Sequence, residues 1–166
     1  MRFVIEQRLQ APLEQVEAAF VDPAFLERLA ELPKLGRPQL LEQHAEGDVV
    51  HQDVRYYFAG DLNAAARRVV DPRRLSWIER STLDRGTHRT AIEIVPDNYA
   101  DRLSCSGSIQ LQPDGVDATV RIFEGQLTVR VLLVGKKVES AIVSGMREHA
   151  ELEARIVERW VTEQAR

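Results

Sequence analysis

The C-terminal stretch of this chain constrains the fold more than any other feature. It predicts a strand over residues 129–134, a break at Gly135, and then one long amphipathic helix to the end of the chain. A lone helix of this length needs a large apolar surface to lie on, and the rest of the chain is typical of strands. We therefore expect a curved sheet around the helix, which would enclose space for a small molecule. The side chains at helical spacing are Val138, Ile142, Met146, His149, Leu152, Ile156 and Trp160.

Length and composition indicate one globular domain over residues 1–166, with 44% hydrophobic and 29% charged residues. A net charge of −4 disfavours a nucleic-acid partner, which would select a basic surface. The single cysteine, Cys105, excludes an intrachain disulfide and favours a reducing compartment. The N-terminus alternates like a strand, and no apolar run approaches the ~18 residues of a membrane span. We therefore expect a cytoplasmic protein without integral membrane association.

Prolines and glycines divide the remaining chain into strands and short helices. Pro12 and Pro23 suit the first turn of a helix, where the missing N–H costs nothing, and Asp22 is a suitable N-cap. Residues 60–68 favour a helical turn, and residues 71–74 favour a tight turn. The predicted strands cover residues 2–9, 39–45, 48–58, 75–83, 87–95 and 102–112.

The last predicted strand changes phase along its length. Apolar residues take even positions from Val116 to Ile122 and odd positions from Leu127 to Val131. Because a shift of one residue moves every side chain to the other face, a β-bulge at Gly125 is the simplest interpretation. Such a bulge would bend the sheet around the helix.

Three local patterns follow one another in a recognisable order. Ala11-Pro12 opens a helix that leads into Phe20-Val-Asp-Pro23, Val70-Asp-Pro-Arg-Arg-Leu-Ser-Trp77 leads from a proline turn into a strand, and Val134-Gly-Lys-Lys-Val-Glu139 enters the terminal helix. With them, the order of strand, two short helices, several strands and long helix covers the whole chain. The chain therefore resembles the START-like superfamily of polyketide cyclases and lipid-transport proteins (SRPBCC, helix-grip), and within it a bacterial branch.

The resemblance implies an α+β protein with the helix-grip fold. A curved antiparallel sheet of about seven strands, two short N-terminal helices and a long C-terminal helix over the sheet would enclose a cavity. The resemblance further implies binding or transport of a small hydrophobic or amphipathic ligand, lipid-like or polyketide-like, in that cavity. It carries over no catalytic residues, because this superfamily uses one cavity for unrelated tasks.

Polar and aromatic side chains on the inward phases of the predicted elements are the candidate ligand contacts. Burying a polar group unpaired costs roughly 1–3 kcal/mol, so each is either satisfied by a core neighbour or contacts water or ligand. The candidates are Gln52, Tyr56, Phe58, Trp77, Glu79, Glu124, Gly145, Met146 and His149.

His149 is the first of these candidates, because it is the only titratable group that we expect on the apolar stripe of the helix. It titrates near neutral pH and can donate, accept or carry a proton, or it can simply close the core. Gly145 lies one turn earlier, where glycine destabilises a helix by about 1 kcal/mol relative to alanine. It either leaves room or a bend beneath the helix, or permits close packing on the sheet.

The sequence shows no assembled catalytic or metal-binding constellation. The four histidines lack the paired spacing of metal ligands, so we expect no metal and no cofactor. Cys105 lies on an apolar strand face, which is typical of an inert buried thiol. There is no Gly-x-Ser-x-Gly elbow and no glycine-rich phosphate loop.

Three classes of function are compatible with these features. The leading interpretation is a carrier or binding protein for a small apolar or amphipathic molecule. An alternative is a cavity enzyme of the cyclase, dehydratase or hydrolase kind, with His149, Glu79 and Glu124 in general acid–base roles. A third is a protein-interaction module, such as a chaperone-activating domain of the same fold, which would need a sizeable exposed apolar patch.

Overall fold

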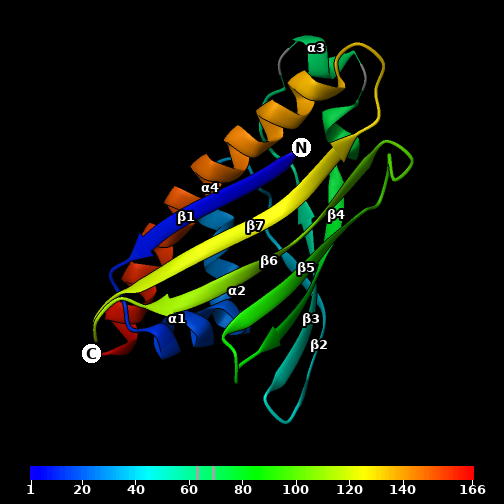
Figure 1. Ribbon diagram of the computed structural model, residues 1–166. Helices are drawn as coiled ribbons and strands as arrows, with labels where there is room; N and C mark the ends of the chain where they lie inside the picture. Colours follow the sequence, from blue (N-terminus) through cyan, green and yellow to red (C-terminus); the bar gives the residue numbers. More distant parts are fainter. Residues whose placement is uncertain (63, 69) are drawn as a thin grey trace.

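The computed structural model describes residues 1–62, 64–68 and 70–166. Its strands form one antiparallel sheet in the order β1-β7-β6-β5-β4-β3-β2. The sheet curves around the long helix α4, and α1 and α2 close one end of the layer (Figure 1). The predicted helix-grip arrangement is confirmed. The elements are β1 (Arg2–Leu9), α1 (Leu13–Phe20), α2 (Pro23–Arg28), β2 (Gln39–Glu46), β3 (Val49–Tyr57), α3 (Ala64–Arg67), β4 (Ser76–Asp84), β5 (Arg89–Pro96), β6 (Leu103–Pro113), β7 (Thr119–Val129) and α4 (Gly135–Gln164).

Local signals start the short helices at or next to the positions that the sequence predicts. The Asp22 side chain accepts a hydrogen bond from the backbone N–H of Ala24 at 2.8 Å, and Pro23 takes the first helical position of α2. Pro12 is the N-cap of α1 rather than a residue of its first turn. The helical turn expected within residues 60–68 is α3, although position 63 lies outside the described residues.

The helix α4 lies mainly against β1, β7 and α1. Its buried stripe is rotated from the predicted one: small and β-branched residues such as Ala150, Ala154 and Val157 make the close contact. The predicted stripe runs beside it and is half-buried, with Ile156 as its buried member. The physical reason is that small side chains let the helix axis approach the β1–β7 edge, while larger ones occupy the flank.

The chain between β7 and α4 is a turn and not the predicted strand over residues 129–134. Leu133 has a φ of 69°, in the left-handed region, and Gly135 begins the helix instead of breaking the chain before it. A Cβ at Gly135 would lie 2.6 Å from the carbonyl oxygen of Val129, so the turn folds tightly back on the strand end. Strand pairing ends at Val129, opposite Leu103.

The predicted bulge at Gly125 is wrong. Pairing of β7 with β1 and with β6 continues without a register shift from Thr119 to Gln126. Gly125 instead makes room for an aromatic ring, because a Cβ there would lie 2.5 Å from Cζ of Phe3. The register shift in the sheet falls in β2, between Leu40 and Glu42.

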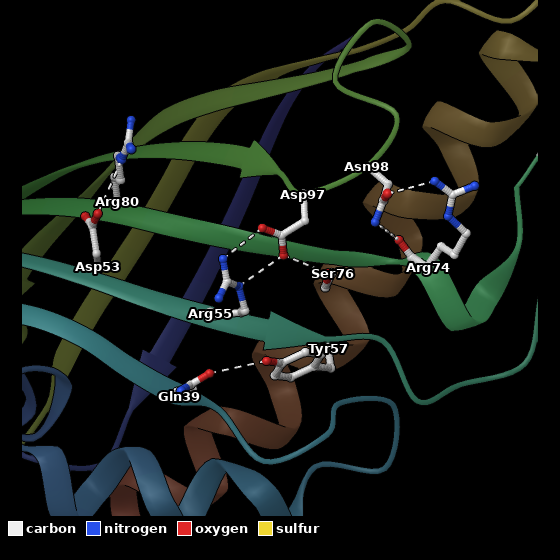
Figure 2. A network of polar contacts seen from close by, with 9 residues as sticks. All are labelled: Gln39, Asp53, Arg55, Tyr57, Arg74, Ser76, Arg80, Asp97 and Asn98. Carbon is white, nitrogen blue, oxygen red and sulfur yellow. Dashed lines mark hydrogen bonds and ion pairs between the residues drawn. The ribbon is translucent and has the colours of Figure 1, made fainter.

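The outer face of the sheet carries a separate network of polar contacts (Figure 2). Arg55 donates two hydrogen bonds to Asp97, at 3.1 and 3.0 Å, and Ser76 donates to the same carboxylate at 2.7 Å. Asn98 and Arg74 exchange hydrogen bonds between the β5–β6 loop and the turn before β4. These contacts fix the loops at one end of the sheet and leave the concave face to other residues.

No helix among the described residues is long and apolar enough to cross a membrane.

Candidate functional site

A buried ion pair joins the concave face of the sheet to α4. Nη2 of Arg121 on β7 lies 2.6 Å from Oε2 of Glu153, and the two residues are 5% and 8% exposed. The guanidinium carbon of Arg121 also lies 4.9 Å from the ring centroid of Phe20 on α1. The ring covers the cation and the carboxylate balances its charge, so the position of Arg121 is fixed from three elements.

His149 extends this pair along α4. Its Nε2 lies 3.8 Å from Oε1 of Glu153, one turn later, which is an ion-pair distance and too long for a direct hydrogen bond. Burial favours the neutral imidazole, but attraction to Glu153 outweighs it and raises the pKa of His149. Burial also opposes charge on Glu153, yet Arg121 and His149 together lower the pKa of that carboxyl to about 2. Glu153 is therefore ionised at neutral pH.

Glu79 on β4 faces the same group of charges. Burial and repulsion from Glu153 raise the pKa of Glu79, and attraction to His149 and Arg121 offsets only part of this, so the pKa is about 7. The side chain is surrounded by protein but keeps some accessible surface, as does His149, whose side chain is 34% exposed. Glu79 and His149 are therefore a coupled pair of titratable groups, one on the sheet and one on α4.

Tyr56 and Trp77 form an aromatic wall beside Glu79. They are directly paired across β3 and β4, and their rings stack with centroids 6.0 Å apart. Burial is the main cause that raises the pKa of Tyr56 well above its usual value, and the charges of Glu79 and Glu153 add to it. Tyr56 thus remains a neutral hydroxyl that can donate a hydrogen bond.

Several buried donors have no hydrogen-bond partner within the described protein. They are Nε and Nη1 of Arg121, Nε2 of Gln7 and Nε2 of Gln52. Gln7 and Arg121 are direct partners in the β1–β7 ladder, so their side chains are neighbours on the concave face. Gln52 lies on β3, opposite Ser81 on β4. A buried donor without a partner is unfavourable, so the Gln7–Arg121 pair favours an acceptor beside it.

The structure places most of the predicted site residues either on the inner face of the sheet or on α4. Gln52, Tyr56, Trp77 and Glu79 occupy inward positions of the sheet, and His149 and Met146 lie on the flank of α4 beside it. Phe58 follows the end of β3 and pairs with Leu35. A Cβ at Gly145 would have no heavy atom within 4 Å, so close helix–sheet packing is not what the glycine provides.

Glu124 is a wrong assignment. Because β7 has no bulge, odd-numbered residues face inward along its whole length, and Glu124 is exposed opposite Ser108 of β6. The same correction brings Arg121 inward, where the sequence interpretation had not placed it. Glu153 was also missed, although its spacing of four from His149 puts both side chains on one helix face.

Cys105 faces inward on β6 and is buried. Burial, with a smaller contribution from Glu79, raises the pKa of the thiol to about 11, so it stays protonated and poorly nucleophilic at neutral pH. In the part of the chain that the structure describes, no three His, Cys, Asp or Glu side chains gather closely enough to hold a metal ion.

The curved antiparallel sheet, the short N-terminal helices and the long C-terminal helix over the sheet define a helix-grip fold. Within that fold, the chain belongs to the family described as "Protein of unknown function (DUF2505)", whose model matches residues 5–161. No curated protein matches the chain.

Solved structures show the same fold at low sequence identity. A protein of Thermus thermophilus, TTHA0849, has a TM-score of 0.70 at 16% identity, with 100% of both chains covered. The Zhui aromatase/cyclase from Streptomyces sp. R1128 has a TM-score of 0.70 at 14% identity, covering 100% of this chain and 96% of that one. Norcoclaurine synthase from Thalictrum flavum, in complex with dopamine and hydroxybenzaldehyde, has a TM-score of 0.65 at 19% identity, covering 98% and 87%. These likenesses establish the fold alone.

Proposed function

We propose that this protein binds a small amphipathic or hydrophobic molecule between α4 and the concave face of the sheet, with a hydrogen-bond acceptor of that molecule on Arg121. The observation that carries the proposal is the pair of unpartnered donors, Nε and Nη1, on a buried guanidinium. Leaving such donors unsatisfied costs about 1–3 kcal/mol each, so a carbonyl or anionic oxygen beside them would be favoured. The amide of Gln7 is a further donor at the same place.

The polar cluster consists of Arg121, Glu153, His149 and Glu79. The apolar part of the ligand would lie against the half-buried residues beside it. Trp77 stacks on Tyr56 on the sheet, and Met146 lies about one turn before His149 on α4. Met146 and Ile142 are half-buried against the apolar cluster of β1, β6 and β7. The likeness to a cyclase and to a synthase that holds dopamine and hydroxybenzaldehyde supports a small organic molecule at this place. The lone cysteine favours a reducing compartment, so we place the binding in the cytoplasm.

A pair of fluorescent probes tests the acceptor on Arg121. Anilinonaphthalene sulfonate carries an anionic acceptor on an aromatic body, whereas N-phenylnaphthylamine has the same body without the sulfonate. Arg121→Lys keeps the positive charge beside Glu153 but removes the guanidinium fork. We expect this variant to weaken sulfonate binding about tenfold and to leave the neutral probe within about twofold, on the basis of one lost charged hydrogen bond.

The matched control is Arg8→Lys, because Arg8 is an exposed arginine of β1 that pairs with Asp114. It should leave both probes unaffected. Equal losses for the two probes in Arg121→Lys, or no binding of either probe to the parent protein, would refute the acceptor role. If the acceptor role is upheld, native mass spectrometry of protein purified from its own host would show the mass of the natural ligand.

A second candidate function is a cavity enzyme of the cyclase, dehydratase or hydrolase kind. The observation that favours it is Glu79, whose pKa of about 7 populates both the acid and the base near neutral pH. His149 lies in the same group of charges and can exchange a proton with a bound molecule. Under this proposal, Glu79→Gln would abolish turnover of any substrate that is found while retaining probe binding. Unchanged turnover in that variant would remove Glu79 from the reaction.

A further inference from the structure

Two leucines project into solvent from the turn between β7 and α4. Leu132 and Leu133 are 92% and 98% exposed, and they lie next to each other in the chain. The turn is held in place: Gly135 donates its N–H to the carbonyl of Val131 at 3.0 Å, and Leu133 adopts a φ of 69°. A leucine rarely adopts that left-handed conformation. The two leucine side chains are therefore exposed on a turn that a backbone hydrogen bond closes.

Positive charges flank these leucines in the chain. Arg130 precedes them, Lys136 and Lys137 follow them, and all three side chains are exposed. The nearest acidic residue along the chain, Glu139, is already engaged, because it accepts a hydrogen bond from the N–H of Val129 at 2.9 Å and pairs with the N-terminal ammonium at 3.5 Å. The turn is therefore basic, although the whole chain carries a net charge of −4.

A second basic feature lies at the same end of the molecule, next to α3 (Figure 1). An open hollow of about 370 Å³ is lined by Arg67, Arg68, Val70, Asp71 and Pro72. Both arginines are exposed. Arg67 donates a hydrogen bond to the carbonyl of Leu62 at 2.7 Å and lies 3.9 Å from the exposed carboxylate of Asp61. Two exposed arginines against one acidic residue, Asp71, in the lining of the hollow suit an anionic group such as a phosphate.

The loop before β6 connects the turn to the hollow. Arg130 donates its backbone N–H to the carbonyl of Arg102 at 2.7 Å, and the Arg102 guanidinium lies 5.6 Å from the ring centroid of Tyr99. The hydroxyl of Tyr99 accepts a hydrogen bond from the N–H of Asp71 at 3.0 Å. Arg74, which exchanges hydrogen bonds with the same loop in Figure 2, lies on Tyr99 as well. The two features therefore belong to one connected surface.

We propose that this surface docks the protein on an anionic lipid membrane. We call it the basic apolar tip and define it by Arg67, Arg68, Arg130, Leu132, Leu133, Lys136 and Lys137. The leucines would enter the interfacial region, and the cations would lie among the lipid phosphates. Two leucines are too small an apolar area for a stable protein interface, which buries roughly 800 Å² on each partner. The proposal is independent of what α4 and the sheet bind.

Vesicle sedimentation of the full chain tests the tip. The vesicles are phosphatidylcholine alone, or phosphatidylcholine with about one third phosphatidylglycerol, an anionic fraction within the regime where basic patches bind. The test variants are Leu132→Ser/Leu133→Ser and Arg67→Gln/Arg68→Gln. The matched controls are Val116→Ser, at an 84% exposed residue in the turn at the opposite end of β6 and β7, and Arg85→Gln, at an exposed arginine of the β4–β5 turn.

We expect binding to the anionic vesicles only, weakened about tenfold by either test variant and by neither control. Added salt should weaken the vesicle binding of the parent protein and of the leucine variant, because salt screens the attraction between exposed charges. Absence of binding to anionic vesicles, or equal losses in the control variants, would overturn the proposal. So would a dimer of the parent protein that the leucine variant abolishes, since a second copy would then cover the tip.

Discussion

Arg121 on β7 and Glu153 on α4 form a buried salt bridge of 2.6 Å between the concave face of the sheet and the helix. The pair connects α4, the last element of the chain, to β7, the strand that precedes it. Charges at this depth are tolerated because each balances the other and because Phe20 covers the guanidinium. The polar cluster is therefore a part of the fold as well as a candidate site.

Removing one partner of this pair should destabilise the protein strongly. Glu153→Ala leaves the buried Arg121 without its anion, and we expect the free energy of unfolding to fall by about 3–5 kcal/mol. Urea unfolding followed by circular dichroism measures the change. The double variant Arg121→Met/Glu153→Leu removes both charges and should recover most of the loss.

The exposed pair of Arg8 and Asp114 is the matched control for this experiment. Asp114→Ala should change the free energy of unfolding by less than about 1 kcal/mol, because water screens exposed pairs. A loss in Glu153→Ala no larger than in Asp114→Ala would show that the buried charge is compensated in some other way.

The stability of the protein should depend on pH through Glu79. Its folded pKa of about 7 lies above the ordinary value of 4.5, so the folded state binds the proton more tightly than the unfolded chain. The resulting stabilisation is complete below pH 4.5 and is lost as the pH rises through 7. Glu79→Gln keeps a neutral side chain at every pH and should remove this loss, by an amount on the order of 1–3 kcal/mol.

The measurement is the difference in unfolding free energy between Glu79→Gln and the parent protein at about pH 5 and about pH 8, on either side of the folded pKa. We expect Glu79→Gln to gain on the parent protein as the pH rises. A difference that is the same at both values would mean that Glu79 titrates normally.

The order of the elements was predictable because its signals are local. Strand alternation, the proline starts of α1 and α2, and the turn residues each act over a few neighbours. Asp22 illustrates this: its capping bond reaches only to Ala24. The long helix followed from spacing alone, although its rotation did not, because the β1–β7 edge decides which flank is buried.

The polar cluster was only partly predictable because its members depend on distant partners. Arg121 stands at an inward position of β7, where local alternation favoured Val120 and Ile122 as the buried residues. Its carboxylate partner lies on another element, which no strand pattern reveals. Glu153 did carry a signal in its spacing from His149, whereas the raised pKa of Glu79 needs the folded arrangement.

Cys105 should react slowly with thiol reagents in the folded protein. Its thiol is buried and has a pKa of about 11, so the thiolate that attacks the reagent is scarce at about pH 8. We expect modification by dithiobis-nitrobenzoate at least about 100-fold slower than in the urea-unfolded chain, whose thiol has a pKa of about 8.5. Comparable rates would indicate that the β6 region opens readily.

Two glycines should respond in opposite directions to the same substitution. At Gly125, a Cβ would lie 2.5 Å from Cζ of Phe3 and 2.8 Å from the carbonyl oxygen of Ser106, so Gly125→Ala should destabilise the fold by about 1–3 kcal/mol. At Gly145, a Cβ meets nothing within 4 Å in the middle of α4, so Gly145→Ala should stabilise it by up to about 1 kcal/mol.

Thermal unfolding of the two alanine variants against the parent protein measures both signs. Probe binding by Gly145→Ala is a second measurement. It should equal that of the parent protein, because a methyl group at this position does not alter the polar cluster. A stabilised Gly125→Ala would mean that the Phe3 ring moves aside without loss. A destabilised Gly145→Ala would mean that α4 needs the backbone freedom of glycine at this position, since no packing contact opposes the methyl group.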